Sequence, residues 1–143
     1  MSTVPAAVGD ERPIVMVTVT SDAGYRGEIR AGRHRLVVDE DTGVGGKDEG
    51  PNPYQLVLAG LVQCTAATVR MYADRKGWEL GTITVRARLL RSGDGATRSD
   101  RIERTIGISE GISDEQRRRL GEIAERTPVT RTLREGLPID TTI

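Results

Sequence analysis

The sequence predicts an α+β fold in which three short strands, a long helix, a pair of strands, a second helix and a last strand follow one another. Three observations lead to this prediction. Strand-like and helix-like segments are partly segregated along the 143 residues instead of alternating strictly. The segment 53–76 reads as one long helix whose first four turns are apolar nearly all round. The core must be aliphatic, because the chain contains no Phe, one Trp and three Tyr.

The length fits a single domain, and a chain of this size buries roughly two thirds of its surface, enough for a real core. We expect residues 1–13 to form a flexible N-terminal tail and residues 14–143 to form the one domain. The tail lacks the basic start and the apolar stretch of a signal peptide. We therefore expect a cytoplasmic protein.

The N-terminal part of the domain reads as three strands. Residues 14–20 are rich in β-branched side chains, which favour strands. Residues 25–30 and 34–39 are predicted to follow as two further short strands. The segment 42–52 after them contains several glycines and is predicted to be a loop.

The long helix has clear signals at both ends. Asn52 is a good N-cap, Pro53 suits the first helical position, and Gly77 is a plausible stop. Residues 50–69 carry no charge, but this segment opens with Gly-Pro-Asn-Pro and contains Gln, Cys and Thr side chains. We therefore interpret the helix as buried in a soluble protein, without a membrane span. One sheet and one modest helix cannot cover it, so we expect a second copy of the chain to complete an obligate homodimer.

The C-terminal part predicts a hairpin, a helix and a strand. Residues 81–90 alternate apolar and polar side chains, and residues 100–109 are expected to return beside them. Ser113 and Gln116 form a capping box that begins the second helix, and Pro128 ends it. Residues 138–143 are predicted to form the last strand.

Charge and composition exclude several classes of function. Lys plus Arg and Asp plus Glu are both 21, so the net charge is zero, which argues against nucleic-acid binding. A single Cys and a single His exclude an internal disulfide and a Cys- or His-rich metal site. We expect no cofactor and no metal.

The single cysteine, Cys64, is predicted to lie in the middle of the long helix, on one face with Gly60 and Thr68. Free cysteines are among the most buried residue types, so a role in packing alone explains it. A reactive thiol is the alternative, and it requires a nearby cation. The helix N-terminus is three turns away, so the cation must come from another part of the chain.

Two sequence segments resemble a known family. The first comprises residues 45–56 (GGKDEGPNPYQL), 64–73 (CTAATVRMYA) and 76–78 (KGW). The second comprises residues 126–133 (RTPVTRTL), where Cys-Pro-Val-His-Arg-Thr-Leu is usual. Together they resemble the OsmC/Ohr family of osmotically induced and organic-hydroperoxide-resistance proteins, nearest to its Gly-Pro-Asn-Pro-Tyr branch.

The resemblance implies antiparallel sheets wrapped around two central helices in an intertwined homodimer. It also implies an active site at the subunit interface. Cys64 falls on the family's peroxidatic position, where a thiolate attacks the peroxide O–O bond. An arginine of the N-terminal hairpin holds that thiolate charged, and the match suggests Arg26, with Arg30 as the fallback.

This chain departs from the family pattern in three places. Thr127 stands at the position of the resolving cysteine and cannot form a disulfide. Tyr54 stands at the position of the glutamate that pairs with the arginine, and Gln55 beside it is an amide. Neither a hydroxyl nor an amide can supply the fixed negative charge that would hold Arg26 in place. Thr130 replaces the histidine of the second motif. Tyr54, Gln55 and Thr127 are predicted to line the substrate site.

The first hypothesis is a thiol-dependent peroxide reductase that uses Cys64 and Arg26 on small apolar hydroperoxides in oxidative-stress defence. An external thiol would be its reductant. A second hypothesis is a non-peroxidatic relative that binds a small apolar ligand at the dimer interface. A third is a structural module in which Cys64 is inert.

Overall fold

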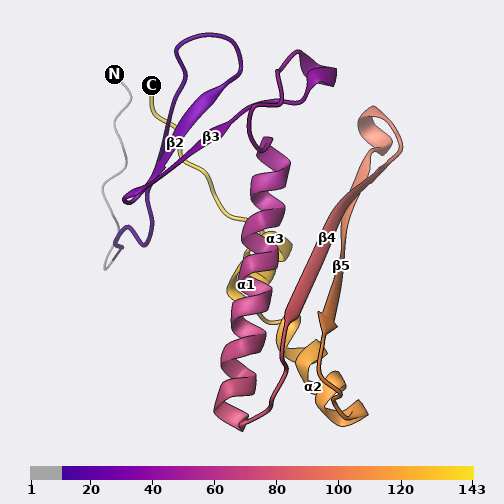
Figure 1. The fold of residues 1–143 in the computed structure, drawn as a ribbon. Helices are drawn as coiled ribbons and strands as arrows, with labels where there is room; N and C mark the ends of the chain where they lie inside the picture. Colours follow the sequence, from indigo (N-terminus) through magenta and orange to yellow (C-terminus); the bar gives the residue numbers. More distant parts are fainter. Residues whose placement is uncertain (1–10) are drawn as a thin grey trace. The chain divides into compact units, whose positions relative to one another are not determined.

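A computed structural model describes residues 11–143, which divide into two compact units (Figure 1). The first unit contains the described residues up to Pro53 together with Leu137–Ile143. The second unit contains Tyr54–Gly136. Most of the tail predicted for residues 1–13 lies outside the described residues, and the single-domain organisation stays a prediction.

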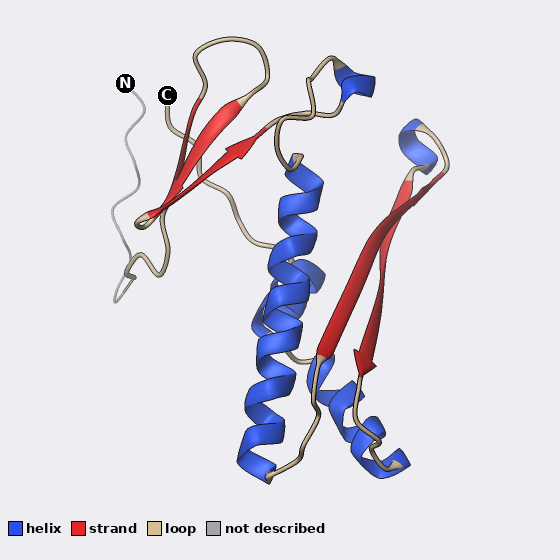
Figure 2. Cartoon of the chain, viewed as in Figure 1, coloured by secondary structure: helices blue, strands red, loops and turns tan. Residues whose placement is uncertain are grey.

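The first unit contains a three-stranded antiparallel sheet in the order β1-β2-β3 (Figure 2, red). Its elements are β1 (Val17–Thr20), β2 (Gly27–Ala31), β3 (His34–Val38) and the short 3-10 helix η1 (Thr42–Val44). Gly27 is buried, and a Cβ there would stand 2.7 Å from the Val19 side chain, so the close approach of β1 requires glycine. The three strands fall within the segments that the sequence predicts as strands, apart from their end residues.

The second unit opens with α1 (Pro53–Lys76), whose bounds confirm the predicted helix. Its buried residues are spaced one turn apart, as expected for one face of a helix: Leu61, Thr65, Val69 and Ala73. The predicted hairpin is formed by β4 (Ile83–Ser92) and β5 (Ser99–Ile108), which pair antiparallel and are joined through η2 (Gly95–Thr97).

Two shorter helices complete the second unit, α2 (Asp114–Ala124) and α3 (Pro128–Glu135). The predicted capping box at the start of α2 is confirmed, because Ser113 and Gln116 bond reciprocally to each other's backbone N–H. The core joins α1, α2 and the base of the hairpin. It is formed by Val69, Ala73, Leu80 and Leu120, with Tyr72, Trp78, Ile83, Ile108 and Ile112 packed against them.

Two segments differ from the sequence-based prediction. The last strand predicted at residues 138–143 is wrong, because these residues form no strand. A strand exists only where a neighbour accepts its backbone hydrogen bonds, and no ladder includes this segment. Pro128 is predicted to end the second helix, but α2 already ends at Ala124, and Pro128 instead occupies the first turn of α3 after the N-cap Thr127.

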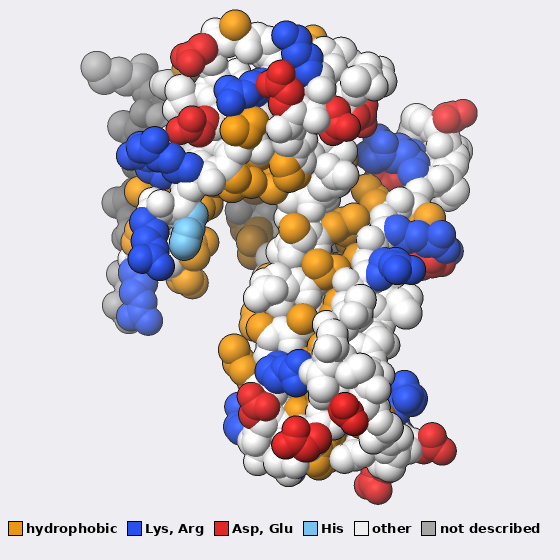
Figure 3. Space-filling view, in the orientation of Figure 1, with side chains coloured by type: hydrophobic (Ala, Val, Ile, Leu, Met, Phe, Trp, Pro, Cys, Tyr) orange, Lys and Arg blue, Asp and Glu red, His pale blue; other side chains and the backbone are white. Residues whose placement is uncertain are grey.

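The surface of α1 is largely uncovered by its own chain. Val57 and Met71 are 42% and 61% exposed, and hydrophobic side chains are visible along this helix in Figure 3. Within residues 11–143, α1 alone is long and apolar enough to cross a membrane by length and composition, and 22% of its most apolar window is buried. The core helix of a soluble protein passes the same test, so this property by itself does not indicate a membrane protein.

Candidate active site

The thiol of Cys64 lies on a partly open face of α1. The side chain is partly buried, and its sulfur is 4.0 Å from Oγ1 of Thr68, one turn further along the helix. Gly60 lies one turn before it, and apart from its chain neighbours and the nearby helix backbone no atom stands within 4 Å of the place where a Cβ would be. The helix surface next to Cys64 is therefore open at Gly60 in the single chain.

The neighbouring residue, Thr65, points into the interior of the second unit and is fully buried. Its hydroxyl donates to the carbonyl oxygen of Leu61 at 2.7 Å and accepts a hydrogen bond from Nη1 of Arg104 at 3.0 Å. Cys64 thus places its thiol on the outer side of α1, and Thr65 binds the guanidinium of Arg104 on the inner side of the helix.

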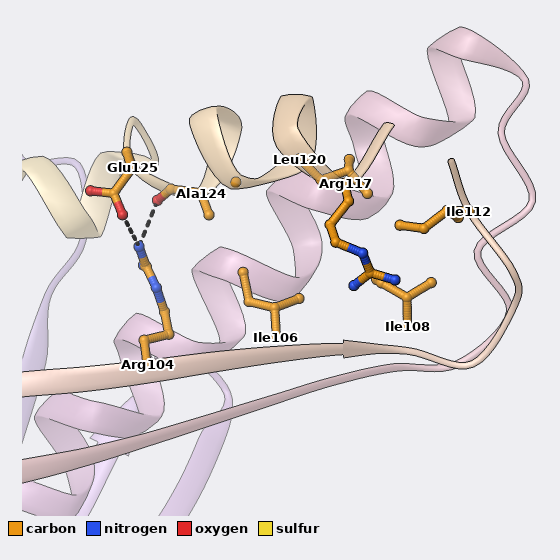
Figure 4. Close-up of a pocket in the computed structure, with 9 residues that line it drawn as sticks. Arg104, Ile106, Ile108, Ile112, Arg117, Leu120, Ala124 and Glu125 are labelled. Atoms are coloured by element: carbon orange, nitrogen blue, oxygen red, sulfur yellow. Dashed lines mark hydrogen bonds and ion pairs between the residues drawn. The ribbon is translucent and has the colours of Figure 1, made fainter. Parts of the chain in front are cut away.

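Arg104 comes from the middle of β5 and lies among apolar residues. In the hairpin register it stands opposite Ala87, and Ile102 and Ile106 flank it on the same face of the strand. Its side chain is only 11% exposed. Nη1 also donates to Oγ1 of Thr130 at 2.8 Å. Nη2 donates to the carbonyl oxygen of Ala124 at 3.0 Å (Figure 4).

The charges around Arg104 only partly balance it. Burial lowers the pKa of its guanidinium, while attraction to Glu125 and Cys64 raises it and repulsion from Arg134 lowers it, leaving the pKa below its ordinary value. Glu125 lies 3.7 Å from Nη2 of Arg104. Arg104 is therefore a buried cation that Glu125 attracts and Arg134 repels.

The N-terminus of α3 completes this cluster. Thr127 is the N-cap, and its hydroxyl accepts the backbone N–H of Thr130 at 3.3 Å. The hydroxyls of Thr127 and Thr130 are 2.6 Å apart and share a hydrogen bond. We call Thr65, Arg104, Thr127 and Thr130 the arginine cluster; it ties α1, β5 and α3 together.

Two hollows in the second unit meet at Arg104. One, of about 270 Å³, lies between β5 and α2 and is lined by isoleucines of the strand and by Leu120 (Figure 4). The other, of about 580 Å³, is lined by apolar side chains that include Leu58, Leu61 and Leu133. Charged side chains line it as well: Asp100, Arg101, Arg104, Glu125 and Arg134. Its lining is therefore mixed.

The sequence was compared with models of known protein families. Residues 46–142 match the family described as OsmC-like protein. The chain belongs to the OsmC-like family.

Solved structures agree with this assignment of the fold. The chain is similar to a Psychrobacter arcticus protein named for osmotic stress induction and detoxification response, with a TM-score of 0.74 at 16% identity; 86% of this chain and 90% of that chain are covered. An OsmC-like protein from Mycoplasma pneumoniae gives 0.69 at 18% identity, covering 88% and 89%. An organic hydroperoxide resistance protein from Elizabethkingia anophelis gives 0.69 at 22% identity, covering 88% and 91%. No curated protein matches the chain.

The predicted site residues of this OsmC-like protein fall at different places. Thr127 is fully buried and bonded to Thr130 within the arginine cluster. Tyr54 lies in the first turn of α1 and is 53% exposed, with its ring centroid 5.9 Å from the guanidinium of Arg91. Gln55 follows it and is exposed. Substrate contact by these three residues stays a prediction.

Arg26 lies in the first unit, just before β2, and Cys64 lies in the second. A carboxylate other than the one that the family position would supply stands beside Arg26, because Nε of Arg26 lies 3.1 Å from Oε2 of Glu49. The carboxylate comes from the loop before α1, five residues earlier than the position that the resemblance suggests. Arg30, the fallback, is exposed on β2. Activation of Cys64 by either arginine stays a prediction.

Glu49 is placed by a buried carboxylate. Asp39 is 2% exposed and accepts the backbone N–H groups of Glu40, Lys47 and Glu49 at 2.8, 3.3 and 3.3 Å. Burial acts to raise the pKa of Asp39, but these hydrogen bonds and the charge of Arg26 outweigh it, so the pKa lies below its ordinary value. The carboxylate of Asp39 therefore holds the loop through the backbone N–H groups of Lys47 and Glu49.

Sequence reasoning missed Arg104, although the sequence carries a signal for it. Ile102, Ile106 and Ile108 alternate along β5, and Arg104 interrupts the alternation at an inward position. A charged residue at such a position is rarely buried without a partner. Within residues 11–143, no group of three or more His, Cys, Asp or Glu side chains could hold a metal.

Proposed function

We propose that this OsmC-like protein reduces small apolar hydroperoxides with one cysteine and an external thiol, as part of oxidative-stress defence in the cytoplasm. The observation that supports this proposal best is the placement of Cys64. Its thiol is partly exposed on α1, and the next residue, Thr65, accepts a hydrogen bond from the buried Arg104. A thiolate next to a cation is the nucleophile that peroxide reduction requires.

The proposed reaction balances without a cofactor. The Cys64 thiolate attacks the distal oxygen of the hydroperoxide, the O–O bond breaks, and the departing alkoxide takes up a proton to give the alcohol. Cys64 is left as a sulfenic acid. One external thiol condenses with it, forms a mixed disulfide and releases water. A second external thiol attacks that disulfide and regenerates the Cys64 thiol.

The substitution at position 127 explains why the reductant must be external. Thr127 has no sulfur, and within residues 11–143 Cys64 is the single cysteine. A threonine hydroxyl cannot form the intramolecular disulfide that would otherwise resolve the sulfenic acid. The catalytic cycle therefore passes through a mixed disulfide with a molecule from solution.

We further propose that the active form is a homodimer in which Arg26 serves the site. The exposed apolar side chains of α1, such as Val57 and Met71, need a cover that the chain itself does not provide. A second copy presents the same apolar face and is its simplest partner. Arg26, held by Glu49, would then orient the peroxide.

The decisive experiment follows the consumption of cumene hydroperoxide in the presence of dithiothreitol. We expect turnover by the wild type, none above the uncatalysed rate by Cys64→Ser, and full turnover by Gln63→Ala, which alters an exposed neighbour on the same helix. Wild-type turnover no faster than that of Cys64→Ser would refute the proposal. That result would favour a non-peroxidatic protein that binds a ligand.

A further inference from the structure

The hollow between β5 and α2 is distinct from the proposed peroxide site. Its lining comes from β5, from α2 and from Ile112 before α2, and no residue of α1 contributes to it. It measures about 270 Å³ and is shown in Figure 4. This volume lies just below the range of pockets that hold drug-sized molecules, so the hollow suits a smaller ligand.

The floor of the hollow is apolar and only partly covered. Ile106 and Ile108 stand at inward positions of β5, and Ile112 follows on the way to α2. All three side chains are half-buried although they line the hollow. Apolar surface therefore remains in contact with water here, and a ligand that covers it is stabilised by the hydrophobic effect.

The helix α2 leaves room for a ligand because it carries a glycine at this point. Gly121 is exposed, and apart from its chain neighbours and the nearby helix backbone no atom stands within 4 Å of the place where a Cβ would be. Glycine in a helix interior is less favourable than alanine, so helix formation does not explain its presence. Its effect on the hollow is to keep one side open.

Arginines stand at both ends of the hollow. At one end Arg104 lies 3.7 Å from Glu125, whose carboxylate also pairs with Arg134. At the other end Arg117 reaches from α2 toward Ile108 (Figure 4). The charges at the Arg104 end are largely compensated within the fold, so the two ends differ.

Arg117 also differs from the two arginines that follow it. Arg118 and Arg119 both pair with Glu122. Among residues 11–143, no carboxylate forms an ion pair with Arg117. Its guanidinium is therefore a free cation at the edge of an apolar floor, and the planar fork of a guanidinium matches a carboxylate, which it can bind through two parallel hydrogen bonds.

We propose that this hollow binds a small anion with a short aliphatic body, such as a carboxylate of about six to eight carbon atoms. The carboxylate pairs with Arg117, and the body lies on the isoleucines beside Gly121. Glu125 at the far end does not repel this anion, because two arginines outweigh its charge there. The site uses no atom of Cys64, so it does not depend on the proposed function.

The test titrates the protein with octanoate at pH 7 and follows the methyl signals of Ile106, Ile108 and Ile112 by NMR, which localises the bound molecule. We expect saturable shifts of these signals. Affinity should rise about twofold to fourfold with each CH₂ from butanoate to octanoate, because each CH₂ covers more apolar surface. Octylammonium has the same body and the opposite charge, and should bind about tenfold more weakly or worse.

Variants separate the hollow from the rest of the surface. Gly121→Leu fills the open side and favours the helix, so a folded protein should lose the octanoate-dependent shifts. Arg117→Gln should weaken binding about threefold to tenfold, because it removes the charge that faces the carboxylate. The matched control, Arg118→Gln, alters the neighbouring arginine that pairs with Glu122 and should bind like the wild type.

Three results would overturn the proposal: no saturable shifts in the wild type, equal affinities for octanoate and octylammonium, or a folded Gly121→Leu protein that binds octanoate as tightly as the wild type. Cys64→Ser should bind octanoate normally. Absence of peroxide turnover together with intact octanoate binding would refute only the proposed function.

Discussion

Replacing Thr130 by Val tests how much the arginine cluster contributes to stability. Valine has nearly the same shape as threonine, so the substitution removes hydrogen bonds and leaves no large cavity. The hydroxyl of Thr130 accepts from the Arg104 guanidinium at 2.8 Å and shares a 2.6 Å bond with Thr127. It also lies 3.3 Å from the carbonyl oxygen of Ala124.

The magnitude follows from the kinds of bond that are lost. A hydrogen bond to a charged group contributes about 1.5–3 kcal/mol and a neutral one about 0.5–1.5 kcal/mol. The hydroxyl has one proton, so it cannot donate to Thr127 and Ala124 together. We therefore expect Thr130→Val to lower the free energy of unfolding by about 2–4 kcal/mol, because these contributions do not add fully.

Urea denaturation, followed by far-UV circular dichroism and by the fluorescence of Trp78, measures this change. Trp78 packs against the core of the second unit, so its emission reports unfolding there. All variants are compared at one protomer concentration, because formation of the proposed dimer would add to apparent stability. Thr105→Val, on the exposed side of the same strand as Arg104, is the control and should change stability by less than about 0.5 kcal/mol. Equal unfolding midpoints for Thr130→Val and Thr105→Val would refute the reasoning.

Three further predictions concern the core, the loop and the surface of α1. Leu80→Ala removes a side chain that is 1% exposed and should cost about 2–5 kcal/mol, measured by urea denaturation. The folded-state pKa of Asp39 is lowered, so Asp39 stabilises the fold above its unfolded pKa, and this contribution is lost as the pH falls through the folded value. The difference in melting temperature between wild type and Asp39→Asn should therefore shrink from pH 6 to pH 3; a constant difference would contradict this. Met71→Glu places a charge on the exposed apolar face of α1 and should convert a dimer to monomers in sedimentation equilibrium, whereas Arg75→Ala on the same helix should not.

Local signals predicted the elements that depend on neighbouring residues. The Asn52-Pro53 start and the Gly77 stop place α1 correctly, because capping chemistry is decided within a few residues. The capping box of Ser113 and Gln116 begins α2 for the same reason. The alternation of the hairpin strands also predicts β4 and β5 to within a few residues.

Elements that depend on distant partners were harder to predict. Residues 138–143 have strand-like composition, yet pairing decides whether a strand forms, and no partner is paired with them. The role of Glu49 was missed because its contact with Arg26 spans 23 positions of the chain and depends on how the Asp39 loop folds. The resemblance suggested a carboxylate further along the chain, and the fold supplies one before the helix.

The sequence by itself determined the aliphatic core, the long apolar helix with Cys64 on it and the absence of a second thiol, since these are properties of composition and local spacing. Only the tertiary structure decided where the guanidinium of Arg104 lies. It donates to Thr65, 39 positions earlier, and to Thr130, 26 positions later, because folding brings α1, β5 and α3 within reach of one side chain. The alternation along β5 identifies Arg104 as a charged residue at a position where an apolar one is expected. Which groups bind its guanidinium depends on the elements that folding places around it.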